Sequence, residues 1–362
     1  MKKYPLLLRA VIWLAFLFLT VAALILTQQL LVPLFLSIML AYLLFPYADW
    51  LEKHKVPRIV TNLIVVIGFI VFLAGIIFSV SALSANFAED FPKIKEQFEG
   101  NLQSILGSIT AFTGISSDGI DGFIRDLGET GQYISQLFNA TTNTLLSIGL
   151  LPVYTFLLLF YRDKFRDFIS MLIDSRQEDT VQNIIDQASE VVPRYLKGLL
   201  IVCFILVGLN SLGFYLIGIE YALLFGVIAA LFNLIPYLGT VLGYGVVLLF
   251  VLGTQSPSLA IAVIIQFLIV QFIENNILTP NITGSYVEIN PLVIIFSLIA
   301  AGMVWGLPGM LIIIPYLGLF KIVCENVESL KPVGFLLGTR GTERHSLTID
   351  SLQRRFGWHE DE

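Results

Sequence analysis

Residues 220–253 read EYALLFGVIAALFNLIPYLGTVLGYGVVLLFVLG, and every residue after Glu220 is uncharged. An uncharged stretch of this length is typical of a segment embedded in lipid. As a single helix it would be roughly 50 Å long at 1.5 Å per residue, which exceeds the roughly 30 Å hydrocarbon core. Pro236 removes a backbone donor near its middle, and Gly239 adds backbone freedom. The stretch therefore predicts either one long kinked span or a re-entrant hairpin of half-helices.

The five-residue motif at the centre of this stretch occurs twice. Ile235-Pro236-Tyr237-Leu238-Gly239 recurs identically as Ile314-Pro315-Tyr316-Leu317-Gly318. Broken helices inside a membrane expose backbone groups that need a protein-walled cavity, and paired interrupted segments indicate a transporter binding site. The alternative is one kinked helix at each place and a chance repeat. If 220–253 and 290–325 both cross, the chain has eight spans; if both re-enter, it has six spans and two hairpins.

The rest of the chain belongs to the same class. Hydrophobic residues make up 56% and charged residues 13%, with a mean hydropathy of +0.84, whereas soluble domains carry about 25% charged residues. Only helices satisfy their backbone in lipid without closing into a barrel. We therefore predict an all-α polytopic membrane protein with about eight membrane segments, two of them broken or re-entrant, plus amphipathic extramembrane helices. The other apolar runs cover about 8–28, 30–48, 59–83, 142–161, 198–218 and 258–278.

The distribution of lysine and arginine predicts the orientation. These residues gather at the N-terminus, in the turn at 49–58, in 162–197 and in the C-terminal tail, whereas acidic residues dominate 84–141. By the positive-inside rule both termini should be cytoplasmic, and 84–141 should lie outside. The first run lacks a clear cleavage site, so we expect a retained span rather than a signal peptide. The predicted parts are spans one to three (1–83), an extracytoplasmic amphipathic segment (84–141), span four (142–161), a cytoplasmic amphipathic segment (162–197), a C-terminal membrane core (198–325) and a cytoplasmic tail (326–362).

Both extramembrane segments carry apolar stripes with helical spacing. Such helices either lie on the membrane and pack against neighbours, or form an oligomer contact or a moving gate. The stripes are Phe87, Phe91, Ile94, Phe98, Leu102, Ile105 and Ile109, then Ile120, Phe123, Ile124 and Leu127, and on the inner segment Val181, Ile184, Ile185, Ala188, Val191, Val192 and Tyr195.

Ionisable residues within membrane segments are costly and usually functional, and the best candidate is Glu274. Gln271, Glu274 and Asn275 share one helix face, ahead of an expected bend at Pro280. A carboxylate beside amides suits a cation or a proton, and it equally suits the headgroup region. The predicted pathway residues are Glu274, Asn275, Gln271, Asn233, Pro236, Gly239, Pro280, Pro315 and Gly318; Asn210 and Asn233 also fit interhelical hydrogen bonds.

Several functional classes leave no trace in the sequence. The net charge of −6 does not favour a nucleic-acid partner. There is no HExxH, CxxC, Walker A or G-x-S-x-G motif, and the three histidines lie outside the expected spans. Cys203 and Cys324 lie in apolar surroundings and do not indicate a disulfide. We therefore expect no cofactor, no metal site and no enzymatic activity.

Several short motifs occur in an order that resembles the autoinducer-2 exporter family, also described as PerM-like permeases. The resemblance covers nearly the whole chain. The motifs are Leu43-Leu44-Phe45-Pro46 with Leu51-Glu52, Tyr195-Leu196-Lys197-Gly198, Asn233 to Gly239, Phe272 to Asn276, Leu278-Thr279-Pro280 with Gly284, Asn290-Pro291-Leu292, and Gly306-Leu307-Pro308-Gly309-Met310.

This resemblance implies a multi-pass bacterial inner-membrane protein that forms a homo-oligomer, plausibly a pentamer, and performs secondary transport. It implies partners of two kinds besides membrane lipids: a small polar solute such as autoinducer-2, or a monovalent cation exchanged for a proton. The position-by-position resemblance covers Pro236, Gly239, Glu274, Asn275, Pro280, Asn290 and Pro291. We therefore expect a permease that exports a small polar solute; the alternatives are a Na⁺(Li⁺)/H⁺ antiporter and a membrane scaffold or regulator without transport.

Overall fold

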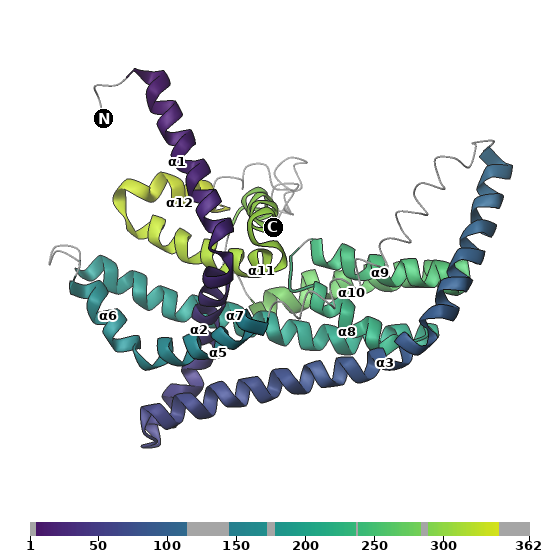
Figure 1. Cartoon of the computed structure of the whole chain (residues 1–362), viewed down its shortest axis with the longest axis horizontal. Helices are drawn as coiled ribbons and strands as arrows, with labels where there is room; N and C mark the ends of the chain where they lie inside the picture. Colours follow the sequence, from purple (N-terminus) through teal and green to yellow (C-terminus); the bar gives the residue numbers. More distant parts are fainter. Residues whose placement is uncertain (1–4, 114–144, 172–177, 237, 284–288, 340–362) are drawn as a thin grey trace, which may run out of the picture.

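The computed structural model describes residues 5–113, 145–171, 178–236, 238–283 and 289–339, and in these ranges all regular structure is helical (Figure 1). This confirms the all-α prediction for the described residues. Six helical stretches are long and apolar enough to cross a membrane; they belong to α1 (Leu6–Leu26), α2 (Gln28–Lys53), α3 (Arg58–Thr113), α7 (Glu178–Ile217), α10 (Pro257–Ile273) with η1 (Glu274–Thr283), and α11 (Pro291–Asn326). The shorter elements are α5 (Leu145–Phe160), α6 (Arg162–Met171), α8 (Ala222–Phe232), α9 (Leu238–Thr254), η2 (Glu328–Leu330) and α12 (Lys331–Leu337). The count of eight membrane segments stays a prediction.

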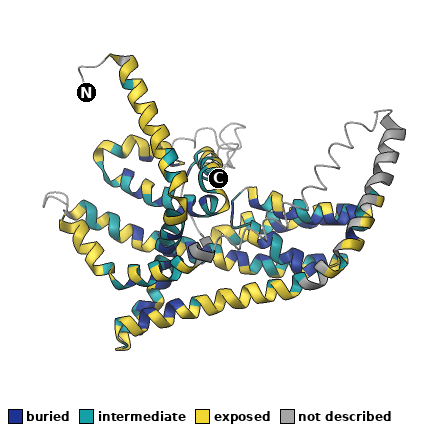
Figure 2. Cartoon of the chain, in the orientation of Figure 1, coloured by how far each residue is buried: buried dark blue, intermediate teal, exposed yellow. Residues whose placement is uncertain are grey.

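The first two apolar runs do not form the expected antiparallel pair. Helical hydrogen bonds continue through the junction, from Thr27 N to Ala23 O at 2.9 Å and from Leu31 N to Thr27 O at 3.0 Å. The Thr27 hydroxyl also bonds to Ala23 O, so this polar residue satisfies itself within the helix instead of starting a turn. The start of α1 and the 49–58 turn therefore lie at opposite ends of a bent rod (Figure 1). The side of the membrane on which each lies stays a prediction. Figure 2 shows α1 almost entirely exposed.

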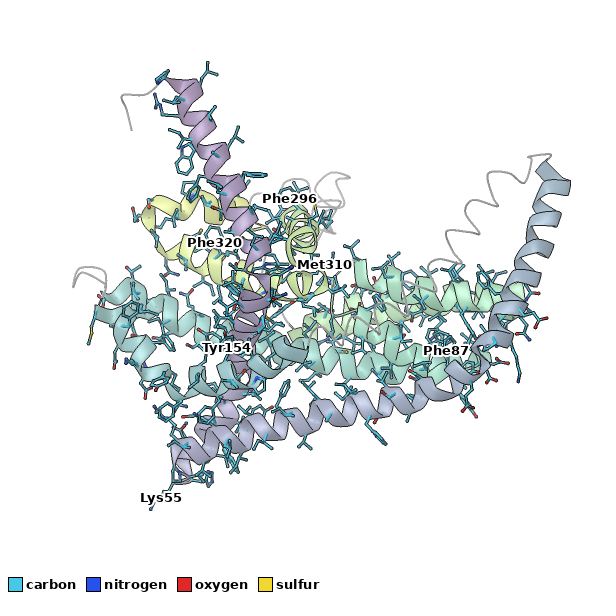
Figure 3. All side chains as sticks on the ribbon, viewed as in Figure 1. Lys55, Phe87, Tyr154, Phe296, Met310 and Phe320 are labelled. Carbon is cyan, nitrogen blue, oxygen red and sulfur yellow. The ribbon has the colours of Figure 1, made fainter. Side chains whose placement is uncertain are left out.

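Helix α3 is much longer than a membrane span. It continues beyond the expected span end at residue 83 to Thr113, and its outer part lies across the ends of α8 and α9 (Figure 1). Phe87 packs against Phe225 and Phe250. Figure 3 shows Phe87 beside α8 and α9. Asn101 Nδ2 donates to Gly253 O at 2.9 Å. The first outer stripe is thus helical and holds one end of the α8–α9 pair, while the second, at 120–127, lies outside the described residues.

A hydrogen bond also fixes this outer contact. The Tyr221 hydroxyl donates to Asp90 Oδ2 at 2.6 Å, which joins α3 to the residue before α8. The bond to the Asp90 carboxylate raises the pKa of Tyr221 to about 12, because losing the proton would bring two negative charges together. Tyr221 therefore remains a donor throughout the physiological pH range.

Helices α8 and α9 form a tight antiparallel hairpin, with the first Ile-Pro-Tyr-Leu-Gly word at its apex. At 1.5 Å per residue their 11 and 17 residues extend only about 16 and 25 Å, shorter than a membrane span. A Cβ atom on Gly239 would lie 1.7 Å from the carbonyl oxygen of Phe232, and one on Gly243 would lie 2.9 Å from Ala229 Cα. Pro236 occupies a turn position that needs no N–H donor. The chain thus breaks at the first copy of the repeat, as expected.

Helix α11 is also folded back on itself, but not at the second copy of the repeat. It breaks at Gly306, whose φ of 63° and ψ of −145° are accessible mainly to glycine. Beyond this point the two arms lie so close that a Cβ on Gly309 would be 2.3 Å from Ala301 O. Pro315 and Gly318 instead lie buried within the second arm. The prediction of a break at the second copy was therefore wrong, because the conformation at Gly306 decides where the chain turns.

The start of α11 agrees with the sequence. Asn290 caps the helix by accepting a hydrogen bond from Leu292 N at 3.0 Å, and Pro291 takes the first helical position. Asn290 N also donates to Leu337 O at 2.7 Å, and Asn326 Nδ2 donates to Gln187 Oε1 at 3.3 Å. The two open ends of the α11 hairpin, α12 and the first half of α7 therefore lie at the same end of the molecule.

A group of four charged side chains joins the end of α2, the start of α3 and the start of α6. Arg162 binds both carboxylate oxygens of Glu52, at 3.0 and 2.5 Å, and Arg58 binds Asp163 at 2.6 Å. Arg162 also lies over the Phe45 ring, 5.1 Å from its centroid. Bidentate arginine–carboxylate pairs are among the stronger hydrogen-bonded ion pairs, so we expect this pair to hold the end of α2 and the start of α6 together.

Replacing Arg162 with lysine is expected to destabilise the protein by about 1–2 kcal/mol, because an ammonium group cannot reproduce the bidentate geometry. Arg162 and Glu52 are each only 19% exposed, so solvent does not screen the pair fully. The measurement is the melting temperature in detergent, with Arg166→Lys on the exposed side of α6 as the matched control. Equal melting temperatures for both variants would show that the ion pair contributes nothing.

Candidate functional site

The strongest polar cluster among the described residues lies where the apex of the α8–α9 hairpin meets the end of α10. Asn233 Nδ2 donates to Glu274 Oε1 at 2.6 Å, and Gln271 Nε2 donates to Glu274 Oε2 at 2.7 Å. Asn233 is the residue that ends α8, so the hairpin turn aims its amide at α10. Each oxygen of the Glu274 carboxylate is therefore held by a different amide group.

The local winding of the chain places Glu274. Helix α10 ends at Ile273 and continues as the π-helix η1 through Thr283, a rare conformation that is frequent at functional sites. The wider turns change the pairing of the carbonyl groups, and Asn276 and Asn281 donate their side-chain amides to the carbonyl oxygens four residues earlier. Pro280 lies inside this π-helix, which continues to Thr283, and the expected bend there stays a prediction.

A second set of polar side chains lies next to the first. The Tyr244 hydroxyl donates to Asn210 Oδ1 at 2.5 Å, and Gln266 Nε2 donates to the Asn210 carbonyl oxygen at 3.1 Å. Asn210 is 2% and Gln266 8% exposed, although both lie in strongly apolar helices. Asn210 therefore makes the interhelical contacts that its position suggested, and Tyr244 and Gln266 extend the cluster beyond the predicted residues.

These two sets border one narrow crevice between α7, α8, α9 and α10. It is too narrow to hold a water molecule in this conformation. Its lining contains a single ionisable carboxylate and no basic residue; the lining residues are Leu206, Asn210, Ala229, Asn233, Thr240, Tyr244, Val270, Gln271 and Glu274. Within the part of the chain that the structure describes, no group of three or more metal-ligating side chains occurs.

The structure gathers only some of the predicted pathway residues. Glu274, Gln271 and Asn233 meet as described, and Pro236 and Gly239 form the adjoining apex. Asn275 is exposed instead, because successive residues of a helix point in different directions and only one of the pair can face Asn233. Pro280 is exposed as well, and neither residue borders the crevice.

Comparison with known proteins identifies the family of the chain. The family model described as AI-2E family transporter matches residues 14–329 of this chain. The chain belongs to this family. Among its relatives, YrrI of Bacillus subtilis is 26% identical over 304 residues, covering 81% of this chain and 85% of YrrI. The AI-2 transport protein TqsA of Escherichia coli is 24% identical over 346 residues, covering 93% of this chain and 97% of TqsA.

Family membership confirms the resemblance seen in the sequence and makes the chain a permease of the AI-2E transporter family. Together with the apolar helices it indicates a multi-pass membrane protein. A family of transporters also agrees with the expectation that the chain is not an enzyme.

Proposed function

We propose that this chain exports a small, neutral, hydroxylated solute across the bacterial inner membrane, and that the solute passes through the crevice beside Glu274. The observation that carries the proposal is a closed polar crevice bordered by the apex of a helical hairpin. Buried polar groups inside a membrane protein mark solute pathways, and a hairpin too short to span the core can shift without unfolding a full helix.

The chemistry of the lining supports a neutral solute. Amides, hydroxyls and one carboxylate offer both donors and acceptors, whereas an anion would find no basic side chain among the lining residues. TqsA is described as an AI-2 transport protein, which makes autoinducer-2 the first solute to test.

The alternative of cation–proton antiport has less support. A cation would need several oxygen ligands, but both Glu274 oxygens accept hydrogen bonds from amide N–H groups. The scaffold hypothesis does not account for a polar crevice in the membrane core.

Orientation and assembly form part of the same proposal. We infer that the end bearing Glu52, Arg162, the first half of α7 and α12 faces the cytoplasm, since basic residues concentrate there. The C-terminus then lies inside, and 84–141 lies outside. We further propose a homo-oligomer, a pentamer, in which the exposed apolar surface of α1 contacts lipid or a second copy.

The test uses purified protein in liposomes loaded with autoinducer-2 or erythritol, with and without imposed pH and sodium gradients. Protein-dependent efflux of either solute is expected. If neither solute leaves the proteoliposomes faster than it leaves liposomes without protein, the export proposal fails. If proton movement instead follows a sodium or lithium gradient and is lost in Glu274→Gln, the antiport alternative holds.

A further inference from the structure

Gln266 carries a buried hydrogen-bond acceptor that has no partner. Its side chain is 8% exposed, its Nε2 donates to the Asn210 carbonyl oxygen, and its Oε1 makes no hydrogen bond. A buried polar atom without a hydrogen-bond partner destabilises the fold, and in lipid no surrounding solvent offsets that cost. We therefore expect a hydrogen-bond donor to bind this oxygen at some stage of transport.

The orientation of this amide group is set by its surroundings. The Asn210 carbonyl is an acceptor, so the Gln266 amide must present its NH₂ group there and its oxygen on the other side. Gly213 leaves room for this arrangement, since a Cβ at that position would lie 2.3 Å from Gln266 Nε2. The free oxygen is thus a consequence of fixed geometry.

Gln266 lies one helical turn beyond the crevice. Val270 lines the crevice, and Gln266 precedes it by four residues on the same face of α10. Asn210 borders the crevice too, and it binds both Tyr244 and Gln266. A solute leaving Glu274 along this face would meet Gln266 next.

We propose that Gln266, with Asn210 and Tyr244, forms a second binding station whose free oxygen accepts a hydroxyl group of a neutral, hydroxylated solute. This inference rests on the proposed function and adds a selectivity-determining residue to it. A single amide oxygen suits one O–H donor, whereas a metal cation needs several oxygen ligands. A water molecule offers the same donor chemistry, so the experiment must distinguish a solute hydroxyl from a water.

The experiment compares erythritol with 1,4-butanediol, which has the same chain length but lacks the two inner hydroxyls. Half-saturation concentrations are measured in proteoliposomes for the wild type, Gln266→Met and Gly213→Ala. Methionine keeps the length of the side chain but offers no strong acceptor, and the alanine methyl displaces the Gln266 amide while leaving glutamine in place. The matched control is Gly208→Ala. Gly208 lies in α7, as Gly213 does, and nothing lies within 4 Å of its added Cβ.

Wild type and Gly208→Ala are expected to prefer erythritol, and this preference should fall by about 5- to 10-fold in both test variants, the effect of one hydrogen bond. If the partner is a water molecule, the variants will change both solutes equally and the proposal is overturned. If the wild type moves autoinducer-2 but neither erythritol nor 1,4-butanediol, the proposal for Gln266 is also overturned, whereas the proposed export stands. If wild type moves none of the three, both proposals fail.

Discussion

Transport by the Glu274→Gln variant is expected to fall by about 100-fold, while the protein still folds. The Glu274 carboxylate accepts one hydrogen bond from Asn233 and one from Gln271. Glutamine offers a single acceptor oxygen, so its own NH₂ group would face one of these two amide donors. Losing one bond to a charged group and leaving a half-buried donor without a partner together cost about 3 kcal/mol, which corresponds to a factor of about 100.

The measurement is the efflux rate of autoinducer-2 from proteoliposomes, with the melting temperature as a check on folding. Asn275→Gln is the matched control, because Asn275 adjoins Glu274 in sequence but is exposed and does not border the crevice. Full transport by Glu274→Gln would mean that the carboxylate is only a structural link between α8 and α10. A comparable loss in Asn275→Gln would place the pathway on the other face of the helix.

The sequence predicted elements whose cause is local. Apolar length identified six helices long enough to cross a membrane. The proline and glycine at 236 and 239 marked a place where the chain is interrupted, because both residues act on their own backbone, but they did not decide between a kink and a hairpin. The spacing of Gln271 and Glu274 placed them on one helix face. The apolar runs 8–28 and 30–48 were expected to form separate, antiparallel spans, yet the Thr27 hydroxyl bonds within the helix and the helical hydrogen bonds continue through the junction.

The rest depended on contacts between distant segments. The second Ile-Pro-Tyr-Leu-Gly word is identical to the first, but Gly306 turns the chain before it is reached, so Pro315 lies inside a helix arm. Asn233 meets Glu274 only because the hairpin brings residues 41 positions apart together. Tyr244 carries no signal by itself, since tyrosine is ordinary in membrane helices. Gln266 is a polar residue in an apolar run, but its contact with Asn210 and its buried, unpaired oxygen are visible only in the structure.

Gly239→Ala is expected to prevent accumulation of folded protein, with a loss of about 3 kcal/mol or more in stability. The added Cβ would lie 1.7 Å from the carbonyl oxygen of Phe232 and 2.5 Å from its carbonyl carbon. These are backbone atoms at the end of α8, so no side-chain rotation relieves the clash and the hairpin must open. Overpacking of this kind typically costs 1–3 kcal/mol even where side chains can adjust.

The matched control is Gly245→Ala, six residues further along α9, where nothing lies within 4 Å of the added Cβ. Alanine is about 1 kcal/mol better than glycine in a helix interior, so this variant should be as stable as the wild type or more stable. Yield and melting temperature after detergent extraction measure both. Similar melting temperatures for the two variants would mean that α8 and α9 separate at little cost. The apex beside Asn233 would then be a loose turn, and it could not hold Asn233 in place against Glu274.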